Sequence, residues 1–382
     1  MDNLERFISV LDLKIPDKVP IFAQSILPEF EEKCRSVLSV GKFGALRGRN
    51  RILDFSVHRA LAIEGGLARG DSALVPNLQG PLKVDPDDLP RPCAGAQLGG
   101  DRFVDFYGRV METGTFMGKE TTWYVGPYLQ GEEDFDNWDH LYPRPLAEDY
   151  VEDLQWTMEA GGQLGFLPVP ICQGLFAKTT EVFGLGRVAR MFIQNPAFLE
   201  RVLDALLEVK LDIIDQYHAL HVHVVAVSDD IALKGSTFLS PQHYERFFVP
   251  RLQQITARAR SHGIRTILHS DGYVTPLLPG VLRAGFNAIE CLEPAAGVDL
   301  TAVKRECGAG ICLVGNIDVP HLLARGSLQE VRAEVKRTLE IGMPGGAFSL
   351  CPAGDLLGEC RVRNVQEIAR VRDRFGVYPQ LP

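Results

Sequence analysis

Apolar runs and amphipathic segments alternate along the second half of the chain. Short runs rich in β-branched and other apolar residues are each followed by a segment of helical period, which is typical of parallel βα units. Several of these runs are apolar at successive positions, as in strands buried on both faces. The predicted strands are Val222–Ser228, Arg265–His269, Ala288–Leu292, Ile311–Gly315 and Ala347–Cys351.

The intervals between these strands have the pattern of helices. The predicted helices are Pro241–His262, Thr275–Ala284, Leu300–Glu306, Leu328–Ile341 and Arg363–Phe375. Upstream, a strand is predicted at Phe166–Ile171, with helices near Thr179–Phe192 and Pro196–His218 after it. Val19–Phe22 and Ser72–Val75 are candidates for the first two strands.

This alternation places the chain in the α/β class. An open doubly wound sheet has a similar period, but the regular βα spacing favours a (β/α)8 TIM barrel. We expect a single domain over residues 1–382 with an N-terminal elaboration, a length that such barrels reach. The Pro- and Gly-rich stretch Gly80–Gly100 is predicted to be a loop, and Asp101–Thr122 a hairpin inserted over one barrel face.

Composition and charge exclude several classes of protein. The net charge of −9 argues against a nucleic-acid partner, because phosphate binding requires a basic surface. No apolar stretch approaches the 18 residues of a membrane span, and the first residues lack a signal-peptide core. The eight cysteines are scattered without a CxxC pair, which favours a reducing, cytoplasmic location over a disulfide framework.

Polar residues of the kind that bind metals or transfer protons follow several of the predicted strands. In a barrel these strand ends form the active-site mouth. His269 and Asp271 are two residues apart and therefore point to the same face, and Gly272 permits a sharp exit. The pair could hold a metal, could act as a base with its orienting carboxylate, or could simply hydrogen-bond to the next loop.

Asp229 and Asp230 end another strand. Because adjacent strand residues face opposite ways, at most one of them points into the mouth, as an acid, a base or a binder of substrate, and the other is expected to cap a loop.

Three further positions in or just after the predicted strands are candidate metal ligands. Cys351 ends the last strand and could supply a thiolate, although buried free cysteines are common. Glu293 follows a strand and precedes Pro294, so we prefer it to Glu290 as a carboxylate ligand. The structural interpretation is favoured for Cys291, Cys312, His221 and His223.

Longer runs of the chain resemble the uroporphyrinogen decarboxylase superfamily, whose fold is a TIM barrel. The resemblance lies in DDIALKGSTFLSPQHYERFFVPRL, LHSDGYVTPLL, AGFNAIECLEP, VDL and LVGNID, and in RFISVLDLKIPDKVPIF near the start. The porphyrin decarboxylases of this superfamily carry an arginine-rich motif, RQAGRYLPE(Y/F). The corresponding Phe22–Phe30 reads FAQSILPEF, without the arginines that would hold substrate carboxylates.

The other branch of the superfamily comprises zinc methyltransferases that work with corrinoid proteins. Their motif is His-x-Cys-Gly, followed by an acidic residue on the next strand and a later cysteine. His269 and Gly272 match this motif, with Asp271 at the first cysteine position. The resemblance implies one zinc held by His269, Asp271, Glu293 and Cys351. It also implies a corrinoid (cobalamin) cofactor, expected on a partner protein.

The aspartate at position 271 bears on the substrate. A carboxylate in place of a thiolate leaves the metal more electrophilic, which suits polarisation of an ether oxygen better than activation of a thiol. The sequence therefore favours demethylation of an O-methylated small molecule, such as a methoxylated aromatic. Two alternatives stay open: a metal-free decarboxylase using Asp229 or Asp230, and a non-catalytic corrinoid or tetrapyrrole carrier.

Overall fold

Parallel strands form a closed barrel at the centre of the molecule. The structure is a computed structural model that describes residues 1–40, 55–68, 95–116, 119–138, 141, 143 and 145–379. Within these residues one sheet has the strand order β1-β2-β7 and another the order β15-β14-β13-β12-β9-β8. A parallel bridge between Ile21 and Leu350 joins the first sheet to β15. Only Pro170 separates β7 from β8, so the two occupy one strand position, and eight positions complete the ring.

The barrel strands agree closely with the sequence prediction in the second half of the chain. They are β1 (Phe22–Ala23), β2 (Gly65–Leu67), β7 (Leu167–Val169), β8 (Ile171–Gln173), β9 (Val224–Ser228), β12 (Arg265–Ser270), β13 (Ala288–Cys291), β14 (Cys312–Asp318) and β15 (Phe348–Ala353). The (β/α)8 fold class is therefore confirmed. The second strand lies at Gly65–Leu67, whereas the predicted Ser72–Val75 and most of the predicted loop at Gly80–Gly100 fall outside the described residues.

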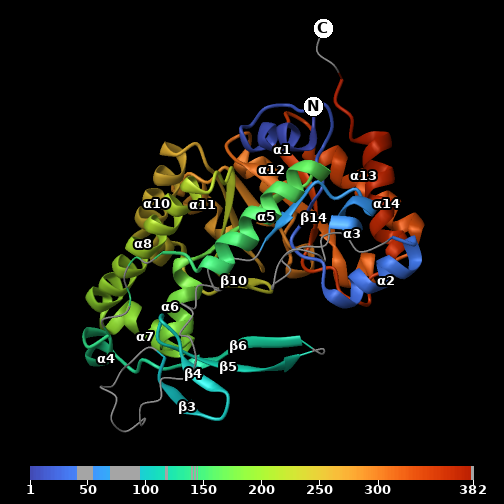
Figure 1. The fold of residues 1–382 in the computed structure, drawn as a ribbon. Coiled ribbons are helices and arrows are strands. Elements are labelled where there is room, and N and C mark those ends of the chain that lie inside the picture. Colours follow the sequence, from blue (N-terminus) through green and yellow to red (C-terminus); the bar gives the residue numbers. More distant parts are fainter. Residues whose placement is uncertain are drawn as a thin grey trace.

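Helices form the outer layer of the barrel (Figure 1). In chain order they include α2 (Pro28–Leu38), α3 (Phe55–Ala60), α5 (Glu148–Leu164), α6 (Leu175–Phe183), α7 (Leu185–Gln194), α8 (Pro196–Ala219), α9 (Pro241–His243), α10 (Val249–Ser261), α11 (Leu278–Ala284), α12 (Leu300–Cys307), α13 (Leu328–Gly342) and α14 (Val362–Phe375). The helix predicted near Thr179–Phe192 is in fact two, because Gly184 adopts a φ of +79° between α6 and α7, which breaks helical geometry.

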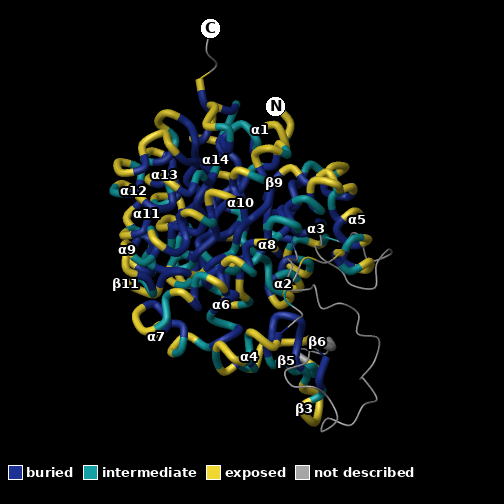
Figure 2. Tube along the Cα trace, turned by 90° about the vertical axis from the view of Figure 1, so that its left-hand side faces the viewer, coloured by how far each residue is buried: buried dark blue, intermediate teal, exposed yellow. Residues whose placement is uncertain are grey.

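Two apolar layers hold the barrel together. The inner one contains strand residues such as Phe22, Val169 and Ala226, and the short helix α1 (Asn3–Leu11) adds Phe7 and Val10 to it at the amino end. The outer one lies between strands and helices. Figure 2 shows the buried residues inside a largely exposed helical surface.

A four-stranded antiparallel sheet is inserted between the second and third barrel positions. It consists of β3 (Gln97–Gly99), β4 (Arg102–Val104), β5 (Arg109–Phe116) and β6 (Lys119–Pro127), so the inserted element is larger than the predicted hairpin at Asp101–Thr122. The buried Arg109 guanidinium joins Asp105 within the insertion to Glu181 on α6. Because α6 follows the carboxyl end of β8, the insertion lies on the mouth side of the barrel (Figure 1).

The structure bears on two sequence predictions, the lack of a disulfide framework and the lack of a membrane span. Seven cysteines of the described ranges are free and buried, which agrees with the expected lack of a disulfide framework; the cytoplasmic location stays a prediction. None of the helices described is both long and apolar enough to cross a membrane.

Candidate functional site

Inward-facing positions along the strands place the candidate site. Ile267, Ala288 and Val314 belong to the inner core of the barrel. Because strand side chains alternate between faces, the residues two positions later also point inward, and these are polar. They are His269, Glu290 and Asn316.

His269 is oriented by a buried carboxylate. Its Nδ1 lies 2.5 Å from Oε2 of Glu290, and Glu290 is fully buried. Burial disfavours the imidazolium, but the negative charge and hydrogen bond of Glu290 outweigh it and raise the pKa of His269 to about 9. Since Nδ1 is engaged, Nε2 is the nitrogen left to face the mouth, where Oδ1 of Asp230 lies 3.8 Å away.

Asp230 and Asp271 complete a cluster around that nitrogen. One ligand-type atom from each of Asp230, His269 and Asp271 lies within 4.8 Å of the others. The backbone N–H of Asp271 donates to Oδ1 of Asp230 at 3.1 Å. Burial raises the pKa of Asp271, and its Oδ1 is buried with no hydrogen-bond partner among the described residues. A buried oxygen without a partner, close to Nε2 of His269 and the carboxylate of Asp230, is an arrangement that a cation would satisfy.

The structure resolves which of the two adjacent aspartates faces the mouth. Both oxygens of Asp229 accept backbone N–H groups at the start of α6, from Phe176 at 3.2 Å and Ala177 at 2.7 Å. Its burial raises its pKa to about 7. Asp229 therefore has the capping role expected of one member of the pair, in place of the catalytic role proposed for it, and Asp230 faces the mouth.

Glu293 and Cys351 are not part of the cluster, in contrast to the expected four-ligand set. The carboxylate of Glu293 accepts the N–H of Gly272 at 3.1 Å. The thiol of Cys351 donates to Glu290 and to the carbonyl of Pro352, and burial raises its pKa well above the ordinary value.

Sequence reasoning missed the role of Glu290. Its position offered a signal: it follows inward-facing Ala288 by two residues in a predicted strand, and it pairs in register with His269. An acidic residue inside an apolar strand is rarely left without a partner. The preference for Glu293 relied on its place at the strand end. The direction of the side chain decides which glutamate reaches His269, and that glutamate is Glu290.

Comparison with known proteins identifies the family. Residues 176–375 match the family model "Uroporphyrinogen decarboxylase (URO-D)". The chain belongs to the uroporphyrinogen decarboxylase family. The matched segment of the family contains β9, β12, β13, β14 and β15, and with them every residue of the candidate cluster.

Curated relatives of this family member represent both branches. The methylcobamide:CoM methyltransferase MtaA of Methanosarcina barkeri is 26% identical over 210 residues, which are 54% of this chain and 59% of the relative. The chain thus spans less than two thirds of the length of this relative. A uroporphyrinogen decarboxylase of Crocosphaera subtropica is 26% identical over 273 residues, or 67% of this chain and 72% of the relative.

A solved structure shares the fold over nearly the whole chain. A methyltransferase from Methanosarcina mazei superimposes with a TM-score of 0.67 and 20% identity, over 98% of this chain and 99% of the other. The likeness supports the barrel fold over nearly the whole chain.

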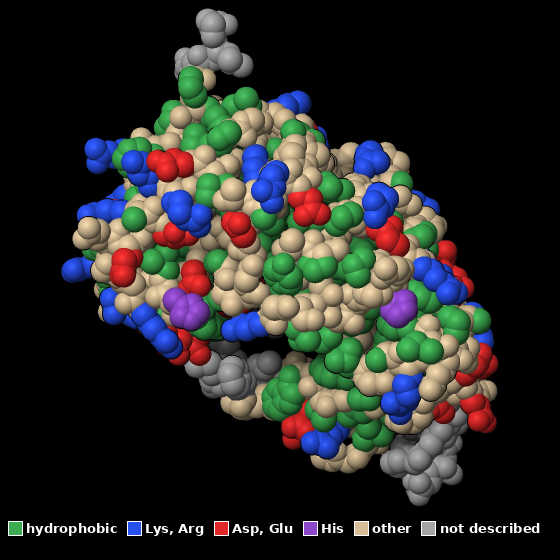
Figure 3. Space-filling model, turned by 180° about the vertical axis from the view of Figure 1, so that it is seen from behind, with side chains coloured by type: hydrophobic (Ala, Val, Ile, Leu, Met, Phe, Trp, Pro, Cys, Tyr) green, Lys and Arg blue, Asp and Glu red, His purple; other side chains and the backbone are tan. Residues whose placement is uncertain are grey.

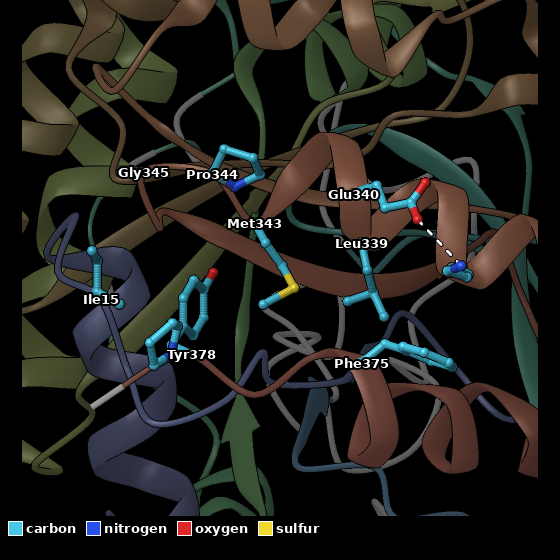
Figure 4. A pocket seen from close by; sticks show the side chains of 10 residues that line it. Ile15, Leu339, Glu340, Met343, Pro344, Gly345, Phe375 and Tyr378 are labelled. Carbon is cyan, nitrogen blue, oxygen red and sulfur yellow. Dashed lines mark ion pairs between the residues drawn. The ribbon is translucent and has the colours of Figure 1, made fainter. Parts of the chain in front are cut away.

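A pocket lies at the opposite end of the barrel from the candidate cluster. It has a volume of about 350 Å³ and is lined mainly by apolar residues, among them Ile15, Leu339, Met343 and Phe375 (Figure 4). Its residues precede β1 or β15, or lie on α13, at the end of α14 or after α14, so it opens at the amino ends of the strands. Its polar side chains, Lys336 and Glu340, pair with each other at 3.6 Å. It therefore lies apart from the candidate cluster.

Proposed function

We propose that this chain is a corrinoid-dependent methyltransferase that moves a methyl group from an O-methylated small molecule to a corrinoid held by a partner protein, with the help of zinc. The observation that carries the proposal is the composition of the cluster. Asp230, His269 and Asp271 offer one nitrogen and two carboxylates at the mouth, without a thiolate. Similarity to MtaA supports methyl transfer involving a corrinoid.

The residues of the cluster fit zinc. Zinc accepts three protein ligands of mixed nitrogen and oxygen type and keeps a position open in catalytic sites. The Glu290–His269 hydrogen bond fixes the ring and makes Nε2 more basic, as carboxylates behind metal-binding histidines do. When bound, the ion would supply a Lewis acid for an ether oxygen.

The reaction transfers a methyl cation equivalent from the ether oxygen to cobalt(I). The carbon–oxygen bond breaks, its electron pair stays on the oxygen, and a carbon–cobalt bond forms with the electron pair of cobalt(I). The chain must therefore stabilise a departing oxyanion and exclude water. The cluster lies at the carboxyl ends of the barrel strands, which is the end of the barrel where the inserted sheet also lies (Figure 1).

Zinc content tests the proposal. We expect about one zinc per chain by elemental analysis of the purified protein, and His269→Ala should lose both the zinc and methyl transfer to free cob(I)alamin. His262→Ala is the matched control, because it also removes a histidine paired with a carboxylate, that of Asp215 at 2.8 Å, but directly after α10 and away from the mouth. Protein without zinc whose activity resists chelators would contradict the proposal.

The main alternative is a metal-free decarboxylase, and the Crocosphaera relative is named a uroporphyrinogen decarboxylase. The segment Phe22–Phe30 carries no arginine, so a substrate with several carboxylates lacks the usual cationic partners there. We predict no measurable release of CO2 from uroporphyrinogen. Saturable turnover would favour the decarboxylase and would direct attention to Arg47, Arg49 and Arg51, which lie outside the described residues.

The third candidate function is that of a carrier of corrinoid or tetrapyrrole. Cobalamin binding, zinc content and turnover together distinguish such a carrier from the methyltransferase and the decarboxylase. A carrier binds cobalamin tightly and shows neither zinc nor turnover. The methyltransferase requires zinc and turns over an added corrinoid.

A further inference from the structure

One polar side chain at the mouth has an unused acceptor that the metal cluster does not explain. Asn316 points into the barrel from β14 and is 1% exposed. Its Nδ2 donates to the carbonyl of Leu292 at 3.1 Å, whereas its Oδ1 is buried without a partner among the described residues. A buried acceptor of this kind is costly unless something donates to it.

The orientation of this amide is fixed. Exchanging its oxygen and nitrogen would place Oδ1 against the carbonyl oxygen of Leu292, and two acceptors repel each other. The atom left over is therefore the oxygen, and it requires a donor. Gln24, which follows β1 on the inward-facing side, offers a second buried oxygen, Oε1, that also has no partner in the described part of the chain.

Asn316 lies close enough to the cluster to touch the same small molecule. Val314 of its strand pairs with Glu290, which holds His269, and Asn316 itself pairs with Cys351. Neighbouring strands are about 4.8 Å apart and residues about 3.3 Å apart along a strand, so two strand spacings and the two-residue step from Val314 put the backbones of His269 and Asn316 about 12 Å apart. Their side chains converge further, because both point into the barrel.

We propose that Asn316 accepts a hydrogen bond from a free hydroxyl group of the methyl donor, so that the substrate is a methoxylated phenol rather than a fully methylated aromatic ether. This inference rests on the proposed function and names its substrate class. The ether oxygen lies at Asp230, His269 and Asp271, and the hydroxyl at Oδ1 of Asn316. Phenolic substitution supplies both groups on one ring.

The competing explanation is purely structural. The amide nitrogen of Asn316 holds Leu292, whose φ of +56° is unusual for a residue with a side chain. Removal of Asn316 could then lower activity by disturbing the loop after β13. A structural defect of this kind weakens the binding of all substrates, whereas loss of a specific acceptor weakens only those that donate to it.

The experiment is a cycle of two substrates and two proteins. The probes are 2-methoxyphenol and 1,2-dimethoxybenzene, which differ in one hydrogen-bond donor. Binding is measured by calorimetry, and methyl transfer to cob(I)alamin by its spectrum. We expect the unaltered protein to prefer 2-methoxyphenol by about tenfold or more in Kd, and Asn316→Ala to bring the two compounds to near parity. Asn364→Ala is the matched control. The buried amide of Asn364, on α14, donates to the backbone carbonyls of Leu323 and Gly326, and its loss should leave the preference unchanged.

Each outcome decides the point. The inference is overturned if the preference survives in Asn316→Ala, or if the unaltered protein has no preference. The proposed function still stands in either case if the protein demethylates the two compounds. If neither compound binds or reacts, the inference fails, and transfer from other methyl ethers decides whether the proposed function fails with it. Should Asn316→Ala not fold, Asn316→Leu provides a second test, because it keeps the volume of the side chain, removes the acceptor and should abolish the same preference.

Discussion

At the scale of single residues, the His269–Glu290 pair dominates the electrostatics of the mouth. In the unfolded chain a histidine has a pKa of about 6.5, whereas in the fold it is raised to about 9. The pair therefore stabilises the metal-free fold fully below pH 6.5, and this contribution is lost as the pH rises through 9. We expect a loss of about 3 kcal/mol over that range, at about 1.4 kcal/mol per pKa unit.

Chemical denaturation of chelator-treated protein at several pH values measures this loss. Glu290→Gln should remove the pH dependence between 6.5 and 9 and should lower the pKa of His269 observed by NMR. An unchanged slope in Glu290→Gln would show that another group is responsible.

Residue types and spacing predicted part of the site. The same-face pair His269 and Asp271 could be read from the period of a strand, and so could the opposite directions of Asp229 and Asp230. Which aspartate turns inward depends on where α6 begins, a tertiary contact that no local pattern contains. The unused oxygen of Asn316 is equally invisible in the sequence, since it depends on what lies around it.

At the scale of elements, the exit from β12 depends on glycine. Gly272 has a φ of +90°, and a Cβ there would lie 2.7 Å from the carbonyl carbon of Ala232 in β10 (Ala232–Leu233). Gly272→Ala should therefore lower the free energy of unfolding by at least about 2 kcal/mol, from backbone strain and overlap together, and should displace the N–H that Glu293 accepts.

Gly235→Ala serves as the control for this prediction. Gly235 has a φ of +70° with open space around its Cβ position, so only strain applies, at about 1 kcal/mol. Equal losses in the two variants, measured by urea denaturation, would show that overlap with β10 contributes nothing.

Elements with a strong period were predictable and those without one were not. The strands β12, β13, β14 and β15 combine apolar runs with flanking helices, and each was placed within a few residues. The strands β1 and β2 are two and three residues long, too short for a period to register. The inserted sheet alternates weakly, and its four-stranded extent depends on pairing between strands rather than on any single strand.

At the scale of the whole molecule, a buried ion-pair network closes the amino end of the barrel. Glu64, just before β2, accepts from Arg6 of α1 at 3.2 Å and Arg372 of α14 at 3.0 Å, and its second oxygen accepts the N–H of Ile21. Glu64→Ala leaves two buried guanidinium groups without this partner and should cost about 3–5 kcal/mol of stability.

The exposed pair Lys336–Glu340 (Figure 4) gives the comparison. Glu340→Ala should change stability by less than about 1 kcal/mol. If the two variants melt at the same temperature in calorimetry, Glu64 does not hold the first and last helices to the barrel. On the face of the molecule seen in Figure 3, acidic and basic side chains are interspersed at the surface.

The two ends of the described chain are tied together at this same amino end. Lys18 pairs with Val377 across an antiparallel bridge, and the N–H of Tyr378 donates to Asp17 at 2.9 Å; both ends lie on the side away from the inserted sheet (Figure 1). An affinity tag, a fluorophore or a surface linker attached at either end therefore projects from the face opposite the mouth. Immobilised protein should present its mouth outward, which allows direct capture experiments with the corrinoid-bearing partner that the proposed function requires.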